Sequence, residues 1–120
     1  MGERSIVEIA DALKSGIAVG DITFIDGTVY KAKDLSSVYD AVTLPSYEEL
    51  KKDKLNYARS FYVQYCNTDP FSGKRLVEPY SDHLYVVQNP PAKPLSQPEM
   101  DRVYSFPYMR TYHPSYEAAG

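Results

Sequence analysis

The stretch NPPAKPLSQPEMDRVYSFPYMRTYHPSYE, residues 89–117, decides how the rest of this chain is interpreted. It holds six of the nine prolines and four of the twelve tyrosines. Because proline fixes φ and has no amide proton, this stretch can form neither a long helix nor a central strand. A segment stiffened in this way cannot bury its tyrosine rings against itself. We therefore expect it to lie on a partner surface, supplied either by the preceding residues or by protein outside this chain.

Size and composition predict one folded domain, or one domain with an extended arm. The chain has 120 residues, of which 43% are hydrophobic and 24% charged, values that are ordinary for a globular protein. A net charge of −3 argues against a nucleic-acid partner, since such proteins concentrate Lys and Arg on one face. The basic cluster Lys51, Lys52 and Lys54 is interpreted as the solvated face of a helix.

A single cysteine limits the chemistry of this chain. Cys66 alone cannot form an intrachain disulfide, a CxxC zinc site or an iron–sulfur cluster, and it favours a reducing, cytoplasmic location. No apolar run of about 18 residues occurs, and the N-terminus is charged where a signal peptide would be apolar. We therefore expect neither a membrane partner nor export.

The first segment has the pattern of an amphipathic helix. Ser5 and Glu8 have the spacing of a capping box, and Gly16 is placed to end the helix. The apolar residues recur at helical spacing, at Ile6, Ile9, Ala10, Leu13 and Ile17. This stripe requires a cover, which we expect from the residues that follow.

A β-hairpin is predicted next. Ile22–Ile25 and Thr28–Lys33 are two short apolar runs separated by Asp26-Gly27, a favoured two-residue hairpin turn. Helix and hairpin together give a small unit over residues 1–33.

The middle of the chain, residues 34–95, is predicted to contain the longest element. Ser46 and Glu49 repeat the capping-box spacing, and a single helix should run from Tyr47 to Cys66 before turn residues at 67–73. Its apolar and aromatic face consists of Leu50, Ala58, Phe61, Tyr62 and Tyr65.

Shorter elements complete the prediction. Leu76–Glu78 and His83–Gln88 have the composition of strands and form a second hairpin. Ser96 with Glu99 in capping-box spacing predicts a short helix that ends near Ser105. The fold class is therefore α+β: one long helix plus shorter helices packed on short β-hairpins, with a Pro/Tyr-rich extended C-terminal arm in the region 96–120.

No residue pattern predicts catalysis, cofactor binding or a metal site. The only two imidazoles, His83 and His113, could combine with Cys66, Asp82 or Glu117, but no two of the strong ligands have metal-binding spacing. GxGxxG, Walker, GxSxG and HExxH motifs do not occur. Tyrosines acting as interface anchors fit the acidic composition better than rings that stack on bases.

The sequence resembles a known family along its whole length. VQNPPAKPLSQPEMDRVYSFPYMRTYHPSYE is similar to the segment just upstream of the iron–sulfur motif in the YgiQ-type family of uncharacterised bacterial radical-SAM proteins. ERSIVEIADAL with DITFIDGTVY resembles the region that follows their cobalamin-binding-like N-terminal domain. LPSYEELKKDKLNYA and NTDPFSGKRLVEPY are similar to the part in between.

The resemblance implies a parent enzyme of unknown reaction, in which a Cys-x3-Cys-x2-Cys loop holds a [4Fe–4S] cluster that cleaves S-adenosylmethionine. Cys66 matches none of those three ligands, so the resemblance transfers no catalytic, cofactor-binding or metal residue to this chain, which would itself be no enzyme. Residues 1–33 would follow the N-terminal domain, 34–95 would form a central unit, and 96–120 would lead to the radical-SAM domain.

Two functions remain open at this point. The first is a non-catalytic accessory region that packs against the catalytic barrel, with the remainder of the parent chain, its radical-SAM and N-terminal domains, as partner. The second is a free-standing protein–protein interaction module that uses the Tyr/Pro-rich arm. In both, the expected anchors are the aromatic residues Tyr104, Phe106, Tyr108, Tyr112 and Tyr116.

Overall fold

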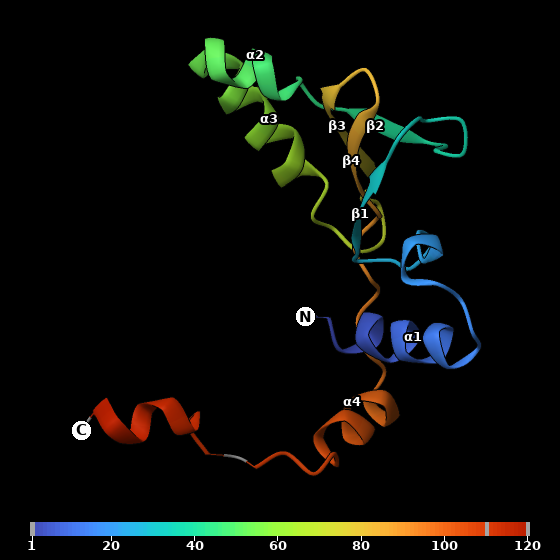
Figure 1. The fold of residues 1–120 in the computed structure, drawn as a ribbon, viewed down its shortest axis with the longest axis vertical. Coiled ribbons are helices and arrows are strands. Elements are labelled where there is room, and N and C mark those ends of the chain that lie inside the picture. The colour runs from blue at the N-terminus through green and yellow to red at the C-terminus, as the bar shows by residue number, and fades with distance from the viewer. Residues whose placement is uncertain (1, 110, 120) are drawn as a thin grey trace.

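The structure, a computed structural model, describes residues 2–109 and 111–119. Figure 1 shows the elements in chain order. The helices are α1 (Glu3–Lys14), η1 (Val19–Asp21), α2 (Tyr47–Lys52), α3 (Lys54–Cys66), α4 (Gln97–Tyr104) and η2 (Pro114–Ala119). The strands are β1 (Val29–Ala32), β2 (Ala41–Thr43), β3 (Arg75–Ser81) and β4 (Leu84–Gln88). The predicted α+β class is confirmed.

The four strands form one mixed sheet in the order β1-β4-β3-β2. β4 is antiparallel to both β1 and β3, and β2 is parallel to β3. The predicted hairpin of β3 and β4 is therefore confirmed. Val77 and Val87 face each other across this pair and are almost completely buried, so the centre of the sheet is the best-packed part of the molecule.

The first predicted hairpin is wrong, although its turn is present. Gly27 has φ +74°, as the Asp26-Gly27 turn requires. β1 pairs with β4, however, and Ile22–Ile25 forms no strand. The reason lies in Asn89, whose buried amide Nδ2 donates to the carbonyl oxygens of Thr23 and Ile25. The carbonyl groups of this segment thus accept hydrogen bonds from a side chain and not from the amides of a neighbouring strand.

The first helix begins earlier than predicted. Its N-cap is Gly2, so Ser5 lies inside the helix, where its buried hydroxyl donates to the carbonyl of Asp26 at 2.8 Å. The predicted capping box of Ser5 and Glu8 is therefore wrong. The expected cover for the apolar stripe is present only in part. Ile9 and Ile17 pack against a small core of Ala12, Ile22 and Ile25, whereas Ile6, Ala10 and Leu13 of the predicted stripe are exposed.

The predicted long helix is divided in two. Asp53 has extended backbone angles, φ −139° and ψ 116°, and its carboxylate accepts from the amide of Leu55 at 2.9 Å. An aspartate can cap a new helix in this way, which competes with continuation of the old one. The capping box of Ser46 and Glu49 is confirmed, and the short strand β2 just before it was missed.

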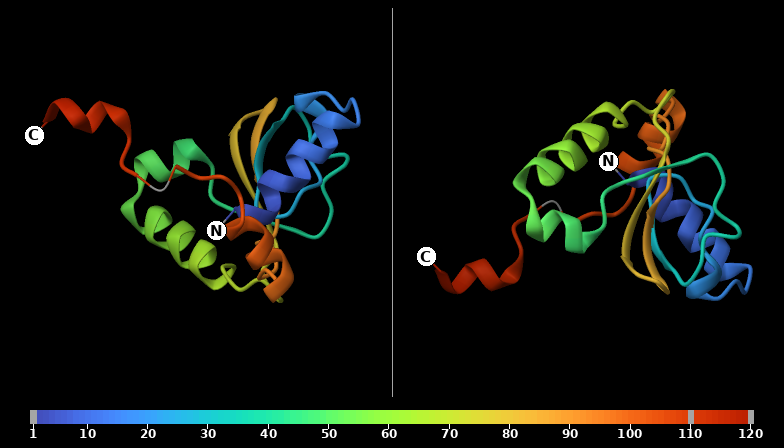
Figure 2. Two further views of the ribbon diagram at one scale, coloured as in Figure 1. Left: turned by 90° about the horizontal axis from the view of Figure 1, so that it is seen from below. Right: turned by 90° about the horizontal axis from the view of Figure 1, so that it is seen from above.

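The helices lie at different places around the sheet. Figure 2 shows the pair α2 and α3 on the opposite side of the sheet from α1, but Figure 1 shows that α1 lies beyond the ends of the strands and does not cover a face of the sheet. The radius of gyration is 17.9 Å, whereas a compact domain of this length has about 14 Å. The chain beyond α4 runs away from the sheet to η2 (Figure 1). The division into residues 1–33, 34–95 and 96–120 stays a prediction.

Candidate interaction surfaces

The predicted anchors begin with Tyr104 at the end of α4 and continue along the arm, residues 106–109 and 111–117. The tyrosines among them are exposed. More than half of the surface of each tyrosine is accessible in Tyr104, Tyr108, Tyr112 and Tyr116, whereas Phe106 is half-buried. Phe106 and Tyr108 lie edge to face, with ring centroids 6.1 Å apart. The arm is not extended throughout, because its last residues enter η2. The role of these five side chains as anchors stays a prediction.

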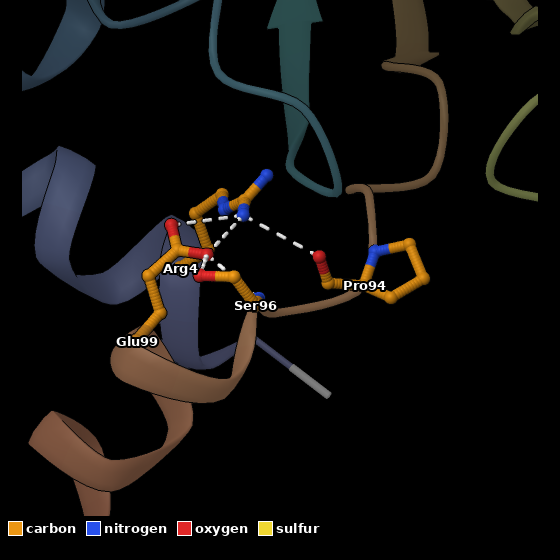
Figure 3. A network of polar contacts seen from close by, with 4 residues as sticks. All are labelled: Arg4, Pro94, Ser96 and Glu99. Atoms are coloured by element: carbon orange, nitrogen blue, oxygen red, sulfur yellow. Dashed lines mark hydrogen bonds and ion pairs between the residues drawn. The ribbon is translucent and has the colours of Figure 1, made fainter.

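The base of the arm is fixed to the first helix by an ion pair. Figure 3 shows Arg4 of α1 donating from Nη2 to both carboxylate oxygens of Glu99 in α4, at 2.7 and 2.8 Å. The same nitrogen contacts the carbonyl oxygen of Pro94 at 3.4 Å. We call this contact the α1–α4 clasp. It links residues 95 positions apart in sequence and sets where the arm begins.

Glu99 has two roles, and both favour its charged form. Its carboxylate accepts from the hydroxyl and the amide of Ser96, which completes the predicted capping box of α4. These hydrogen bonds, followed by the one from Arg4, lower the pKa of Glu99 to about 2. The carboxylate therefore stays ionised at any pH near neutrality.

A second surface is a cleft between the sheet and the helix pair. It has a volume of about 400 Å³ and is walled by aromatic rings from α2, α3 and β3. We call it the α3 cleft. Its lining is Tyr47, Leu50, Lys51, Tyr57, Ser60, Phe61, Gln64, Glu78 and Tyr80. At one end, Tyr47 and Tyr80 stack with centroids 5.1 Å apart, and Lys51 Nζ lies 5.4 Å from the centre of the Tyr47 ring.

The polarity of α3 is reversed relative to an ordinary core helix. Its least exposed residues recur at i, i+4, i+7 and i+11, and three of the four are polar: Asn56, Ser60, Val63 and Asn67. Its exposed large side chains are Leu55, Tyr57, Phe61, Tyr62 and Tyr65. The predicted aromatic face of this helix is thus present in sequence, but Ala58, Phe61, Tyr62 and Tyr65 are exposed and do not pack on the hairpin.

The remaining candidates do not converge on a reactive site. Cys66 is exposed at the end of α3, and its neighbour Tyr62 has a raised pKa because of a hydrogen bond with that thiol. His113 Nδ1 lies 2.8 Å from the hydroxyl of Ser115. Across residues 2–109 and 111–119, no three His, Cys, Asp or Glu residues gather as a metal site would require. None of the helices described in this structure is long and apolar enough to cross a membrane.

Sequence reasoning missed the residues that fix the turn between α3 and β3. Asn67 donates from Nδ2 to the carbonyl of Val63 and accepts at Oδ1 from the amide of Lys74. Gly73 donates to the carbonyl of Asp69 at 2.8 Å. A Cβ at Gly73 would lie 2.6 and 2.7 Å from the carbonyl oxygens of Asp69 and Asn67, so only glycine fits. The turn residues Asn-Thr-Asp-Pro (67–70) and Ser-Gly (72–73) were the sequence signal that indicated a tight turn at this place.

Comparison with known proteins shows which family the chain resembles. It matches the Radical SAM N-terminal family over residues 1–120. A UPF0313 protein of Clostridium botulinum is 48% identical over 120 residues, which cover all of this chain and 18% of that protein. A UPF0313 protein of Clostridium perfringens is 46% identical over 121 residues, with the same coverage. No solved structure matches the chain.

These matches confirm the resemblance to radical-SAM proteins noted in the sequence. The chain spans about a fifth of the length of the curated relatives it matches. Because the family match extends over every residue, the chain belongs to the Radical SAM N-terminal family.

Proposed function

We propose that this chain is a non-catalytic accessory region of a radical-SAM iron–sulfur protein, and that its C-terminal arm packs against the part of that protein that carries the cluster. The observation that carries this proposal is the exposure of Tyr108, Tyr112 and Tyr116 on an arm whose base is fixed by the α1–α4 clasp. Rigid, amphipathic tyrosine rings are typical anchors of protein interfaces.

The residues present do not fit the cofactor of the parent. A [4Fe–4S] cluster in this class needs three cysteine thiolates, and Cys66 stands alone at the end of α3. When bound elsewhere in the parent, the cluster would supply the electron that cleaves S-adenosylmethionine. The acidic net charge and the free thiol suit a cytoplasmic protein that binds neither nucleic acid nor membrane.

Amide hydrogen exchange tests the proposal. We compare exchange at residues 106–117 in the 120-residue chain and in the full-length parent protein, under the same conditions. If the arm is covered by the rest of the parent, its amides exchange roughly tenfold or more slowly in the full-length protein. Equal and fast exchange in both proteins would contradict the proposal and would favour the free-standing interaction module, whose partner is a separate protein.

A matched pair of variants sharpens this test. Tyr112→Ser removes one predicted anchor from the arm, whereas Tyr39→Ser removes a similarly exposed ring from the loop before β2. In the full-length protein we expect the first variant to increase exchange throughout the arm and the second to leave it unchanged. If both variants behave alike, Tyr112 is not an anchor.

A further inference from the structure

We propose that the α3 cleft is a second docking site, occupied in the parent protein by an apolar segment of the same polypeptide from outside these 120 residues. This inference rests on the proposed function in one respect only, namely that the chain is part of a larger protein. It concerns a surface separate from the arm and requires no contact by the arm.

The apolar surface of α3 is distributed unlike that of an ordinary amphipathic helix. An amphipathic helix normally turns its apolar stripe toward the core and its polar side chains toward water. Here Ser60 is almost completely buried, while Tyr57 and Phe61 on the neighbouring positions each expose 65% of their surface. Large exposed aromatic groups gathered around one cleft are typical of a surface that is covered in the complete protein.

Contacts at two places hold the helix pair in position beside the strands. At one end the stack of Tyr47 on Tyr80 attaches α2 to β3. At the other end the hydrogen bonds of Asn67 fix the last turn of α3 to the start of β3. α2 packs against both α3 and β3, whereas contacts between α3 and the strands are fewer. A cleft whose two ends are held by such contacts has its shape before a ligand binds. Binding then requires less ordering of side chains and costs less conformational entropy.

The lining of the cleft determines the chemistry of the occupant. The largest walls are aromatic, from Tyr57, Phe61 and Tyr80, so we expect the part that enters the cleft to be apolar. The two charged residues of the lining, Lys51 and Glu78, have opposite signs and select no net charge for the occupant. An apolar segment with a polar group that reaches Lys51 or Glu78 would therefore match the lining.

The segment comes from the remainder of the same polypeptide. The chain aligns with 18% of the length of its relatives, so most of the parent polypeptide lies outside this region. A segment of the same chain is present at high effective concentration and needs no separate encounter. The open shape of this region, with a radius of gyration of 17.9 Å, leaves its surfaces accessible to such a segment.

Hydroxyl-radical footprinting of the full-length protein tests this inference. Two matched pairs of residues serve as reporters: Phe61 against Phe71, and Tyr57 against Tyr39, each pair with similar exposure in this structure. We expect Phe61 and Tyr57 to be oxidised about fivefold or more slowly than their matched controls, because the core of an interface excludes water. Equal rates within both pairs would overturn the proposal.

The same experiment separates this inference from the proposed function. Oxidation of Tyr108 and Tyr112 reports on the arm. Protection of the arm with fast oxidation of Phe61 would leave the proposed function standing and overturn the α3 docking site. Protection of Phe61 that disappears on dilution would show that a second copy or a separate protein covers the cleft, and would overturn the assignment to the same polypeptide.

Substitutions in the full-length protein provide the second readout. Phe61→Lys places a charge in the cleft next to Lys51, and we expect it to raise the oxidation rate of Tyr57 to that of Tyr39. Phe61→Leu keeps the cleft apolar and should preserve the protection, and Phe71→Lys should have no effect on Tyr57. If Phe61→Lys leaves Tyr57 protected, the segment does not bind in the α3 cleft.

Discussion

The regions around α1 and around α3 are built on opposite principles. Around α1, the apolar residues Ala12, Ile22 and Ile25 pack together and are buried. In α3, a serine is buried while aromatic side chains such as Phe61 are mostly exposed. The first region is completed by residues of this chain. The second is the region that we propose is completed by additional protein.

This difference shows that one chain can contain both a self-sufficient core and an unfinished layer. The sheet and the α1 region are stabilised by contacts within these residues. Substitutions there should therefore lower the free energy of unfolding of the 120-residue chain when it is studied without the rest of the parent. The α2–α3 layer should be insensitive to substitutions on its aromatic face until the rest of the parent is present. The predictions below test that contrast, beginning with the largest expected effect.

Removal of Asn89 should destabilise the α1 region most. Its side chain is buried, donates to Thr23, Ile25 and Thr28, and accepts from Arg75 Nε at 3.0 Å. Asn89→Ala leaves several buried polar groups without partners and should lower the free energy of unfolding by about 3 kcal/mol. Urea denaturation measures this loss. Asn56→Ala, on the helix pair, is the control; equal losses in the two variants would contradict the special role of Asn89.

Gly73→Ala should distort the turn that connects α3 to β3 and lower the stability of the protein. The added methyl group would lie under 3 Å from two carbonyl oxygens, and overpacking of this kind costs about 2 kcal/mol. Gly20→Ala is a matched control, because a Cβ at Gly20 meets nothing within 4 Å. In thermal unfolding, Gly73→Ala should have a clearly lower Tm than Gly20→Ala. A Gly73→Ala protein as stable as Gly20→Ala would mean that this turn does not fix the cleft.

The α1–α4 clasp should weaken in acid. The pKa of Glu99 is about 2 in the folded protein and near 4.5 without its partners. Its contribution is therefore complete above pH 4.5 and is lost as the pH falls from 4.5 to 2. NMR titration of the Glu99 carboxyl carbon should give a midpoint near 2. In Glu99→Gln the protection of the α4 amides, meaning their exchange rates relative to the intrinsic rates at the same pH, should no longer respond to pH in this window; an unchanged response would assign it to another group.

The smallest effect should come from the aromatic face itself. In the 120-residue chain, Phe61→Gln should change the free energy of unfolding by no more than about 0.5 kcal/mol, because the ring is mostly exposed. Urea denaturation is again the measurement, with Val77→Ala at the buried centre of the sheet as the comparison. A loss for Phe61→Gln as large as that for Val77→Ala would show that α3 is already packed within this region.

Local signals allowed much of this fold to be predicted. The capping boxes at Ser46 and Ser96 and the β3–β4 hairpin depend on residues close in sequence, and all three were correct. One error, the division of the long helix, came from a local cap at Asp53 that was missed. Another arose where a distant partner determines the outcome. Ile22–Ile25 has the pattern of a strand. The side chain of Asn89, more than sixty positions away, donates hydrogen bonds to two of its carbonyl groups.

The candidate surfaces could be predicted only in part. The arm residues from Tyr104 to Tyr116 stand out by composition, and the family resemblance followed from the same stretch. The α3 cleft could not be predicted, since an aromatic stripe at helical spacing normally indicates a buried face. Only the three-dimensional structure shows that Asn56, Ser60 and Asn67 take the inner positions.

The central claim is that the α2–α3 layer is completed by the rest of the parent polypeptide. A crystal structure of the full-length protein tests it most directly, through the exposure of Phe61 and Tyr57. We predict that both rings are buried against an apolar segment of the same chain. The account would be contradicted if both rings faced solvent, as exposed as they are in this region by itself.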